Sequence, residues 1–298
     1  HGVPMRDGAL LFTQVFCPVD ASELHPIILF RTPYGIPPYG KAFTHMTIPS
    51  LHFLKEGYIL VIQDIRGRAM SEGTDEYVRP YRRDKRGPAD VDESSDAFDT
   101  VDWLLRNVPG HNGKVGVWGI SYPGFTAAMA AIAAHPAVLA VSPQAPMADI
   151  FMGDDALHNG ALYLAHYANY AYSMGQARPA PTADPPARLR HPTPDGYSFF
   201  LRTGPLKDLT ARVFGDANPV WNAAMAHETY DAYWKALSVY PHLGGIRPAI
   251  LTVGGWYDAE DLGGTLGIYK TIERLNPGLP NTIVMGPWAH GRWNHLAG

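Results

Sequence analysis

The amino-acid sequence predicts an α/β fold with a mostly parallel sheet and an inserted helical cap. Three observations support this prediction. Apolar runs of strand length alternate with helix-like patterns along much of the chain, which is typical of a parallel sheet covered by helices. One apolar run ends in a glycine-flanked serine turn. Between about residues 147 and 243 the strand-like runs stop, and helical segments rich in Ala, Tyr and His take their place.

The strand-like runs and the clearest helix can be assigned in chain order. The runs cover residues 11–16, 26–31, 58–64, 114–118, 138–141, 248–253 and 281–285. A helix is predicted over residues 93–106, with Ala97, Val101, Leu104 and Leu105 on one face. Prolines recur from Pro179 to Pro194 and predict an extended, stiff arm.

These assignments divide the chain into a core and an insertion. Residues 1–146 and 244–298 form the two parts of the core, and residues 147–243 form the helical cap with its proline-rich arm. Ligands of such folds bind beyond the carboxyl ends of the parallel strands. Ser121, Asp258 and His290 each follow shortly after a predicted strand, so we expect them to meet at this edge of the sheet.

The turn at Ser121 has the composition expected around a catalytic nucleophile. Gly119 and Gly124 flank the serine, and small residues of this kind allow a strained turn and its helix to pack closely. The spacing is G-x-S-x-x-G rather than the commoner G-x-S-x-G, and glycine-flanked serines also occur in turns without any catalytic role. The order Ser121, Asp258, His290 is the order expected of an α/β-hydrolase. In that reading Ser121 is the nucleophile, His290 its general base and Asp258 the group that orients the imidazole.

Two donors are candidates for an oxyanion hole. The backbone N–H of Tyr122 follows the nucleophile directly, as the turn requires. The second donor should come from the loop after the predicted strand 26–31, which has no glycine-rich donor motif and contains Tyr34. A side-chain donor at Tyr34 is one interpretation, and a packing role is the other.

Carboxylates accompany the predicted site. Glu260 and Asp261 follow Asp258 closely, and Asp154 and Asp155 open the cap. If they converge, they form an anionic pocket for a substrate ammonium, in which one charge pair at about 4 Å and an effective dielectric near 20 contributes roughly 4 kcal/mol before desolvation. The alternatives are solvated acids that cap a helix dipole, above all Asp154, and a calcium site.

Composition narrows the class of partner. The chain has 298 residues and a net charge of −4, with no basic block that would indicate nucleic-acid binding and no apolar run long enough to span a bilayer. We therefore expect a small-molecule partner, no nucleic acid and no membrane contact. Cys17 is the one cysteine, which excludes an internal disulfide. The sequence begins at His1 without a signal peptide, as expected for a mature or trimmed chain.

The remaining polar residues are predicted to be structural. His158 and His166 lie in the cap without metal-ligand spacing, so packing roles, no metal and no cofactor are expected. Arg66 and Arg68 follow the predicted strand 58–64 and are expected to brace the serine turn through ion pairs.

Five short motifs, taken together, resemble a known family. They are Met5-Arg-Asp-Gly, Arg31-Thr-Pro-Tyr, Asp64-Ile-Arg-Gly, Gly119-Ile-Ser-Tyr-Pro-Gly and Met285-Gly-Pro-Trp-Ala-His. The chain resembles the X-Pro dipeptidyl-peptidase-like hydrolases, a group that includes cocaine esterase, cephalosporin acylases and α-amino acid ester hydrolases. Two further motifs, Met152-Gly-Asp-Asp and Tyr257-Asp-Ala-Glu-Asp, look specifically like the α-amino acid ester hydrolases, which are β-lactam antibiotic acylases.

The resemblance implies a role for each candidate residue. It implies a triad of Ser121, Asp258 and His290, oxyanion donors from the amide of Tyr122 and the side chain of Tyr34, and an ammonium-binding cluster of Asp155, Glu260 and Asp261. It also implies a carboxyl-terminal β-rich jelly-roll domain, whereas this sequence ends shortly after His290, so a fragment or a chain without that domain is expected. Family members are typically bacterial and often exported, so the resemblance favours a periplasmic or secreted protein and allows a homo-oligomer.

The sequence therefore predicts a serine hydrolase that cleaves esters and amides of α-amino acids, including β-lactam antibiotics, through an acyl-enzyme, and that transfers the acyl group. The alternatives are an X-Pro dipeptidyl-peptidase-like enzyme and a cocaine-esterase-like general ester hydrolase. Glu260 and Asp261 argue against the general esterase, because such an enzyme needs no carboxylates to bind a substrate ammonium. The complete triad argues against a catalytically silent binding protein.

Overall fold

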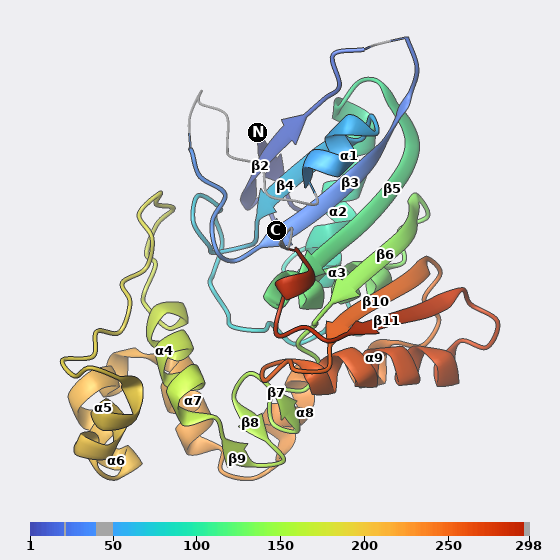
Figure 1. Cartoon of the computed structure of the whole chain (residues 1–298). Helices are drawn as coiled ribbons and strands as arrows, with labels where there is room; N and C mark the ends of the chain where they lie inside the picture. The colour runs from blue at the N-terminus through green and yellow to red at the C-terminus, as the bar shows by residue number, and fades with distance from the viewer. Residues whose placement is uncertain (21, 40–49, 295–298) are drawn as a thin grey trace.

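A mostly parallel sheet forms the centre of the protein in a computed structural model, which describes residues 1–20, 22–39 and 50–294 (Figure 1). Its strands in spatial order are β1 (Gly2–Pro4), β2 (Leu10–Phe16), β4 (Ile59–Asp64), β3 (His25–Thr32), β5 (His111–Ile120), β6 (Val138–Gln144), β10 (Ala249–Gly255) and β11 (Asn281–Gly286). From β4 to β11 neighbouring strands pair in parallel, whereas β1 pairs with β2, and β2 with β4, in antiparallel register. The predicted fold class is confirmed, and each predicted strand is present with ends shifted by a few residues.

Helices cover the sheet on both sides. Figure 1 shows α2 (Glu93–Asn107) and α3 (Tyr122–Ala133) behind the sheet, α1 (Ser50–Lys55) in front of it and α9 (Leu262–Leu275) beside β10 and β11. Helix α2 begins at a capping box in which the side chain of Asp92 accepts from the backbone N–H of Ser95. The predicted apolar face of α2 packs into the core, with Leu105 only partly buried. None of the helices in the described ranges is long and apolar enough to cross a membrane.

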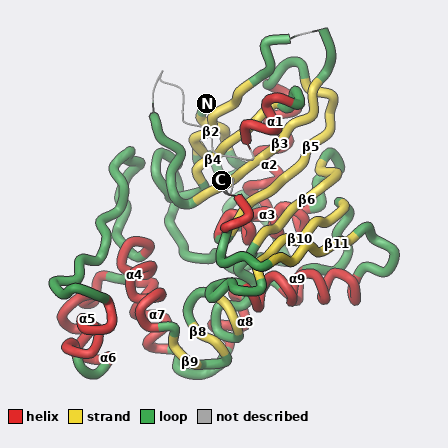
Figure 2. Tube along the Cα trace, viewed as in Figure 1, coloured by secondary structure: helices red, strands yellow, loops and turns green. Residues whose placement is uncertain are grey.

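The segment between β6 and β10 consists mainly of helices and loops (Figure 2). Its helical elements are α4 (Leu164–Met174), α5 (Gly196–Thr203), α6 (Leu206–Leu209), η1 (Thr210–Phe214), η2 (Gly215–Ala217), α7 (Pro219–Ala226), α8 (Ala232–Leu237) and η3 (Tyr240–His242). The expectation that this segment lacks strands was wrong. Three two-residue strands, β7 (Gly153–Asp154), β8 (Leu157–His158) and β9 (Ala161–Leu162), form a small antiparallel sheet. The turn between β8 and β9 is Asn159-Gly160 with positive φ at both residues, a hairpin signal that the sequence carried.

The arginines after β4 do not brace the serine turn directly, which corrects the prediction. Arg66 pairs with Asp7 at 2.6 Å and with Asp96 at 2.7 Å, so it ties the amino-terminal segment to α2. Arg68 pairs with Asp75 at 2.8 Å. Both guanidinium groups are buried, and their carboxylate partners lie outside the serine turn.

Arg31, near the end of β3, is a buried arginine that contacts the helix following the serine turn. Its guanidinium pairs with Glu93 at 3.0 Å, and its backbone carbonyl accepts a hydrogen bond from the hydroxyl of Thr126 in α3. These contacts join β3, α2 and the helix that follows Ser121. They fix the carboxyl end of β3 relative to the turn between β5 and α3.

Candidate active site

Ser121 lies at the tip of a strained turn between β5 and α3. Its φ is +69°, in the left-handed region that residues with a side chain rarely adopt. A Cβ atom on Gly119 would collide with the carbonyl of Pro123, and one on Gly124 would lie 2.6 Å from the carbonyl oxygen of Gln144. The two glycines are therefore required by close backbone contacts, which gives a physical reason for the G-x-S-x-x-G spacing.

Asp258 and His290 meet beyond the carboxyl ends of the neighbouring strands β10 and β11. Nδ1 of His290 is 2.9 Å from Oδ2 and 3.1 Å from Oδ1 of Asp258. Oδ1 also accepts the backbone N–H groups of Glu260 and Asp261 at 2.8 and 3.0 Å. Burial raises the pKa of Asp258, but the hydrogen bond and charge of His290 outweigh it and lower the pKa. Burial lowers the pKa of His290, and the hydrogen bond and charge of Asp258 more than compensate, so this pKa is raised.

A cavity of about 450 Å³ holds the serine and the histidine together. Its lining residues are Tyr34, Ile120, Ser121, Asp155, His166, Tyr170, Glu260, His290, Gly291 and Asn294. Among the described residues no hydrogen bond joins the hydroxyl of Ser121 to His290. Catalytic hydrogen bonds of free enzymes are often long and tighten when substrate binds.

Two hydrogen-bond donors adjoin Ser121. Tyr122 is the first residue of α3, so its backbone N–H has no acceptor within the helix. Tyr34 follows β3 and is 52% exposed as a whole residue, but its phenol interacts with the side chains of Ser121 and Tyr170. Burial of the phenol, followed by the charge of Asp155, raises the pKa of Tyr34. The hydroxyl therefore stays protonated and is available as a donor at neutral pH.

Carboxylates and a second imidazole line the same cavity. Nε2 of His166 lies 3.4 Å from Oδ1 of Asp155 and 3.9 Å from Oε2 of Glu260, and the same Glu260 oxygen lies 3.4 Å from Nε2 of His290. The ring of His166 stacks on that of Tyr163 with centroids 5.0 Å apart. A hydrogen-bonded packing role was predicted for His166, and the structure adds that His166 lines the cavity beside two carboxylates. Its position depends on how α4 docks against the core, for which the sequence offers no local signal.

Asp261 lies behind this group rather than on its surface. It is 0% exposed, and neither of its carboxylate oxygens has a hydrogen-bond partner among the described residues. Burial, reinforced by the charge of Asp155, raises the pKa of Asp261 far above its ordinary value. Of the carboxylates predicted to bind an ammonium, Asp155 and Glu260 line the cavity, whereas Asp261 is buried and is not among the lining residues.

Asp154 is not a solvated acid, contrary to that alternative. It is fully buried in β7, and its carboxylate accepts the backbone N–H groups of Ala148, Asp149 and Gly264 at 2.9, 2.8 and 2.6 Å. Gly264 lies in the first turn of α9, where a carboxylate is favoured by the helix dipole. Asp154 therefore joins the start of the insertion to the helix that follows Asp258.

Asp155, His166 and Glu260 are also the one set of three within the described ranges whose ligand atoms, all within 4.8 Å of one another, could hold a metal ion. Nε2 of His166 faces both carboxylates at ion-pair distances. Burial lowers the pKa of His166, but the nearby carboxylates of Asp155 and Glu260 more than compensate, so this pKa is raised. Because Nε2 of His166 lies at ion-pair distance from both carboxylates, we interpret these residues as an ion-pair cluster.

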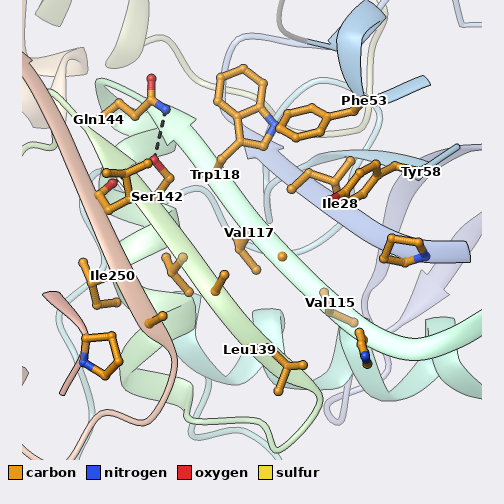
Figure 3. Close-up of a pocket in the computed structure, with 18 of the residues that line it drawn as sticks. Ile28, Phe53, Tyr58, Val115, Val117, Trp118, Leu139, Ser142, Gln144 and Ile250 are labelled. Atoms are coloured by element: carbon orange, nitrogen blue, oxygen red, sulfur yellow. Dashed lines mark hydrogen bonds between the residues drawn. The ribbon is translucent and has the colours of Figure 1, made fainter. Parts of the chain in front are cut away.

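A larger cavity, of about 580 Å³, lies away from this chemistry. It occupies the face of the sheet around β5, β6 and β10 and is lined mainly by apolar side chains such as Ile28, Trp118 and Leu139 (Figure 3). Its few polar side chains include Gln144, whose amide donates to the hydroxyl of Ser142 at 3.0 Å. None of the predicted catalytic residues lines this cavity, so we place the candidate active site at Ser121.

The fold and the grouping of Ser121, His290 and Asp258 are those of the serine α/β-hydrolase class. Residues 7–292 match the family described as X-Pro dipeptidyl-peptidase (S15 family), and the chain belongs to that family. The fold and family resemblance inferred from the sequence motifs are thereby confirmed at the family level.

Individual relatives support the same grouping. Cocaine esterase from Rhodococcus sp. (strain MB1 Bresler) is 30% identical over 301 residues, which is 97% of this chain and 48% of the esterase. The crystal structure of an aminopeptidase from a marine sediment Thaumarchaeota archaeon superposes with a TM-score of 0.89 at 32% identity, covering 99% of this chain and 49% of the aminopeptidase. An α-amino acid ester hydrolase structure gives a TM-score of 0.88 at 34% identity, covering 99% and 48% of the two chains. The chain thus spans about half the length of these relatives.

Proposed function

We propose that this chain is the catalytic part of a serine hydrolase that cleaves esters and amides of α-amino acids, including β-lactam antibiotics, through an acyl-enzyme. The observation that carries the proposal is the position of Asp155 and Glu260, which line the same cavity as Ser121. Apart from Asp258 of the triad, carboxylates have no direct part in acyl transfer by a serine, so the presence of Asp155 and Glu260 beside the nucleophile supports recognition of a cation. The α-ammonium of an amino acid is such a cation, and it is separated from the reacting carbonyl by one carbon.

The proposed chemistry starts with Ser121. Its hydroxyl oxygen attacks the carbonyl carbon while Nε2 of His290 takes the hydroxyl proton, and Asp258 stabilises the resulting imidazolium through Nδ1. The negative oxygen of the tetrahedral intermediate accepts hydrogen bonds from the N–H of Tyr122 and the hydroxyl of Tyr34. The imidazolium then returns the proton to the leaving alcohol or amine, and the acyl group remains on Ser121.

The second half of the reaction determines the product. Water attacks the acyl-enzyme in hydrolysis, with His290 again acting as the base. An amine that occupies the cavity instead of water receives the acyl group, as in the synthesis of a β-lactam antibiotic. The α-ammonium stays with the acyl group throughout, so Asp155 and Glu260 hold it in both halves.

A peptidase is the second candidate. The similarity to an archaeal aminopeptidase supports it, and removal of an amino-terminal residue would use the same ammonium clamp. Comparison of phenylglycine amide with an X-Pro anilide separates amino-acid amide cleavage from dipeptide release. A general esterase, as the similarity to cocaine esterase suggests, would need no clamp.

The deciding experiment compares phenylglycine methyl ester with its des-amino analogue, methyl phenylacetate. A hydrogen-bonded charge contributes about 1.5–3 kcal/mol, so kcat/KM for the amino ester should be higher by a factor of about ten to a hundred. Asp155→Asn should remove much of this preference. Equal kcat/KM values for the two esters in the unmodified protein would overturn the amino-acid assignment and leave the general esterase.

A further inference from the structure

Glu260 lies between two imidazoles that have different tasks. Its Oε2 is 3.4 Å from Nε2 of His290 and 3.9 Å from Nε2 of His166. The side chains of Glu260 and His290 are 28% and 20% exposed, so their attraction is only partly screened by water. Glu260 therefore does more than line the cavity, because it contacts Nε2 of His290, the atom that the reaction requires as a base.

Pairing with Glu260 is incompatible with base catalysis at that atom. A carboxylate accepts a hydrogen bond from Nε2 only when Nε2 carries a proton. In that state the imidazole holds a proton on each nitrogen, one facing Asp258 and one facing Glu260. The imidazole then has no lone pair to accept the proton of Ser121. In agreement with this, no hydrogen bond between the side chains of Ser121 and His290 is present among the described residues.

We infer that Glu260 determines specificity by changing partners: in the free protein its carboxylate pairs with protonated His290, and the α-ammonium of a bound substrate takes over this carboxylate and so releases His290 to act as the base toward Ser121. The proton leaves Nε2 for solvent. This inference rests on the proposed function and extends it, because the amine then promotes the chemical step as well as binding.

The other charged groups around His290 remain in place in this scheme. Asp258 holds Nδ1 in both states, while Asp155 and His166 face Glu260 from the insertion. A bound ammonium cancels the charge of Glu260 and adds a positive charge near His290, and both effects favour the neutral imidazole. Because the ammonium belongs to the acyl group, the effect applies to acylation and to deacylation.

The experiment measures kcat against pH for phenylglycine methyl ester and for methyl phenylacetate. The pH dependence of kcat reports groups in the substrate-bound enzyme. The acid limb of kcat should therefore lie at lower pH for the amino ester than for the des-amino ester. Below the limb, kcat relative to its own plateau should be about three- to tenfold higher for the amino ester.

Two variants distinguish the effect of Glu260 on His290 from the effects of its neighbours. Glu260→Gln keeps the shape and removes the charge, so the two acid limbs should coincide. In the free variant, the imidazole resonances of His290 should titrate at lower pH than in the unmodified protein. Asp155→Asn is the matched control, because it removes a carboxylate that contacts His166 rather than Nε2 of His290. It should preserve the separation between the two limbs.

Coincident acid limbs in the unmodified protein would overturn the inference, as would an unchanged His290 titration in Glu260→Gln. A separation that Asp155→Asn abolished as completely as Glu260→Gln would also overturn it, because the effect would belong to the total charge. The proposed function is tested by the substrate preference in kcat/KM, and the inference by the position of the kcat limb. Failure of one is therefore distinguishable from failure of the other.

Discussion

The serine turn and the carboxylate cluster lie on two sides of one cavity, but they are built differently. The turn is held by the backbone: Ser121 has a strained φ, its N–H donates to Gln144, and its carbonyl accepts from Phe125. The cluster is held by side chains from segments far apart in sequence, and buried Asp261 lacks hydrogen-bond partners within the described part of the chain. One side is a rigid local structure, and the other is a charged group that a cation would complete.

This difference has an energetic meaning. Backbone strain at the turn is compensated by the packing of β5 and α3, so that side is formed before substrate arrives. Buried carboxylates repel one another and lose hydration, and the imidazoles of His166 and His290 offset this cost only in part, because they pair with Asp155 and Glu260 and not with buried Asp261. A bound ammonium relieves that cost. We therefore expect substitutions at the turn to affect kcat most, Asp155→Asn to affect mainly KM, and Glu260→Gln to affect the pH dependence of kcat as well.

The largest effect is expected at the nucleophile. Ser121→Ala should lower kcat by about 10⁶-fold, because no acyl-enzyme can form and only binding and oxyanion contacts remain. The measurement is steady-state hydrolysis of an amino ester together with labelling by a fluorophosphonate, which should disappear. Near-normal turnover in this variant would remove Ser121 from the mechanism.

Asp258→Asn should have the next largest effect. The amide keeps the size of the carboxylate but no longer favours the correct tautomer and the cation of His290, so kcat should fall by about 10⁴-fold. Since Asp258 also accepts the N–H groups of Glu260 and Asp261, a thermal unfolding scan is the necessary control. A loss of activity that only followed a loss of folded protein would contradict a role in catalysis.

The serine turn and the triad residues could be predicted from the sequence far better than the carboxylate cluster. The strands, the order of Ser121, Asp258 and His290, and the glycines around the serine are local features, each with a recognisable pattern. Asp258 and His290 could be expected to meet because each follows a strand of the predicted parallel sheet, although the sequence did not predict that β10 and β11 are neighbours. Their roles in catalysis stay predictions until the variants are measured.

The cluster depends on tertiary packing, so the sequence indicated it only in part. Asp155 and Glu260 line the cavity, but the burial of Asp261 could not be read from the motif Tyr257-Asp-Ala-Glu-Asp. His166 enters the cavity from α4, whose docking has no sequence signal. The hairpin at Asn159 did carry a turn signal within a segment that otherwise reads as helical.

Tyr34 is affected by both sides of the cavity. Its phenol interacts with Ser121, and the charge of Asp155 raises the pKa of the phenol. Tyr34→Phe removes only the hydroxyl. An oxyanion role predicts a fall in kcat of about 10²–10³-fold with a smaller change in KM. The factor by which kcat falls should be the same for amino and des-amino esters, because the oxyanion is common to both. Unchanged kcat would assign Tyr34 a packing role.

The smallest effect is expected from the charge of the cluster, and pH separates it from the others. Asp155→Asn should raise KM for amino esters by about ten- to a hundredfold and spare des-amino esters.

The pKa of His290 is raised, so activity that needs the neutral imidazole is lost as the pH falls through that higher value. The alkaline limb of kcat/KM arises instead from the substrate, whose α-amino group has a reference pKa near 7.7 and must stay protonated to bind. The profile for an amino ester should therefore be bell-shaped, whereas a des-amino ester should keep the acid limb and lose the alkaline one. An alkaline limb that persisted with the des-amino ester would mean that a protein group titrates there, and the assignment of the cluster to the substrate ammonium would fail.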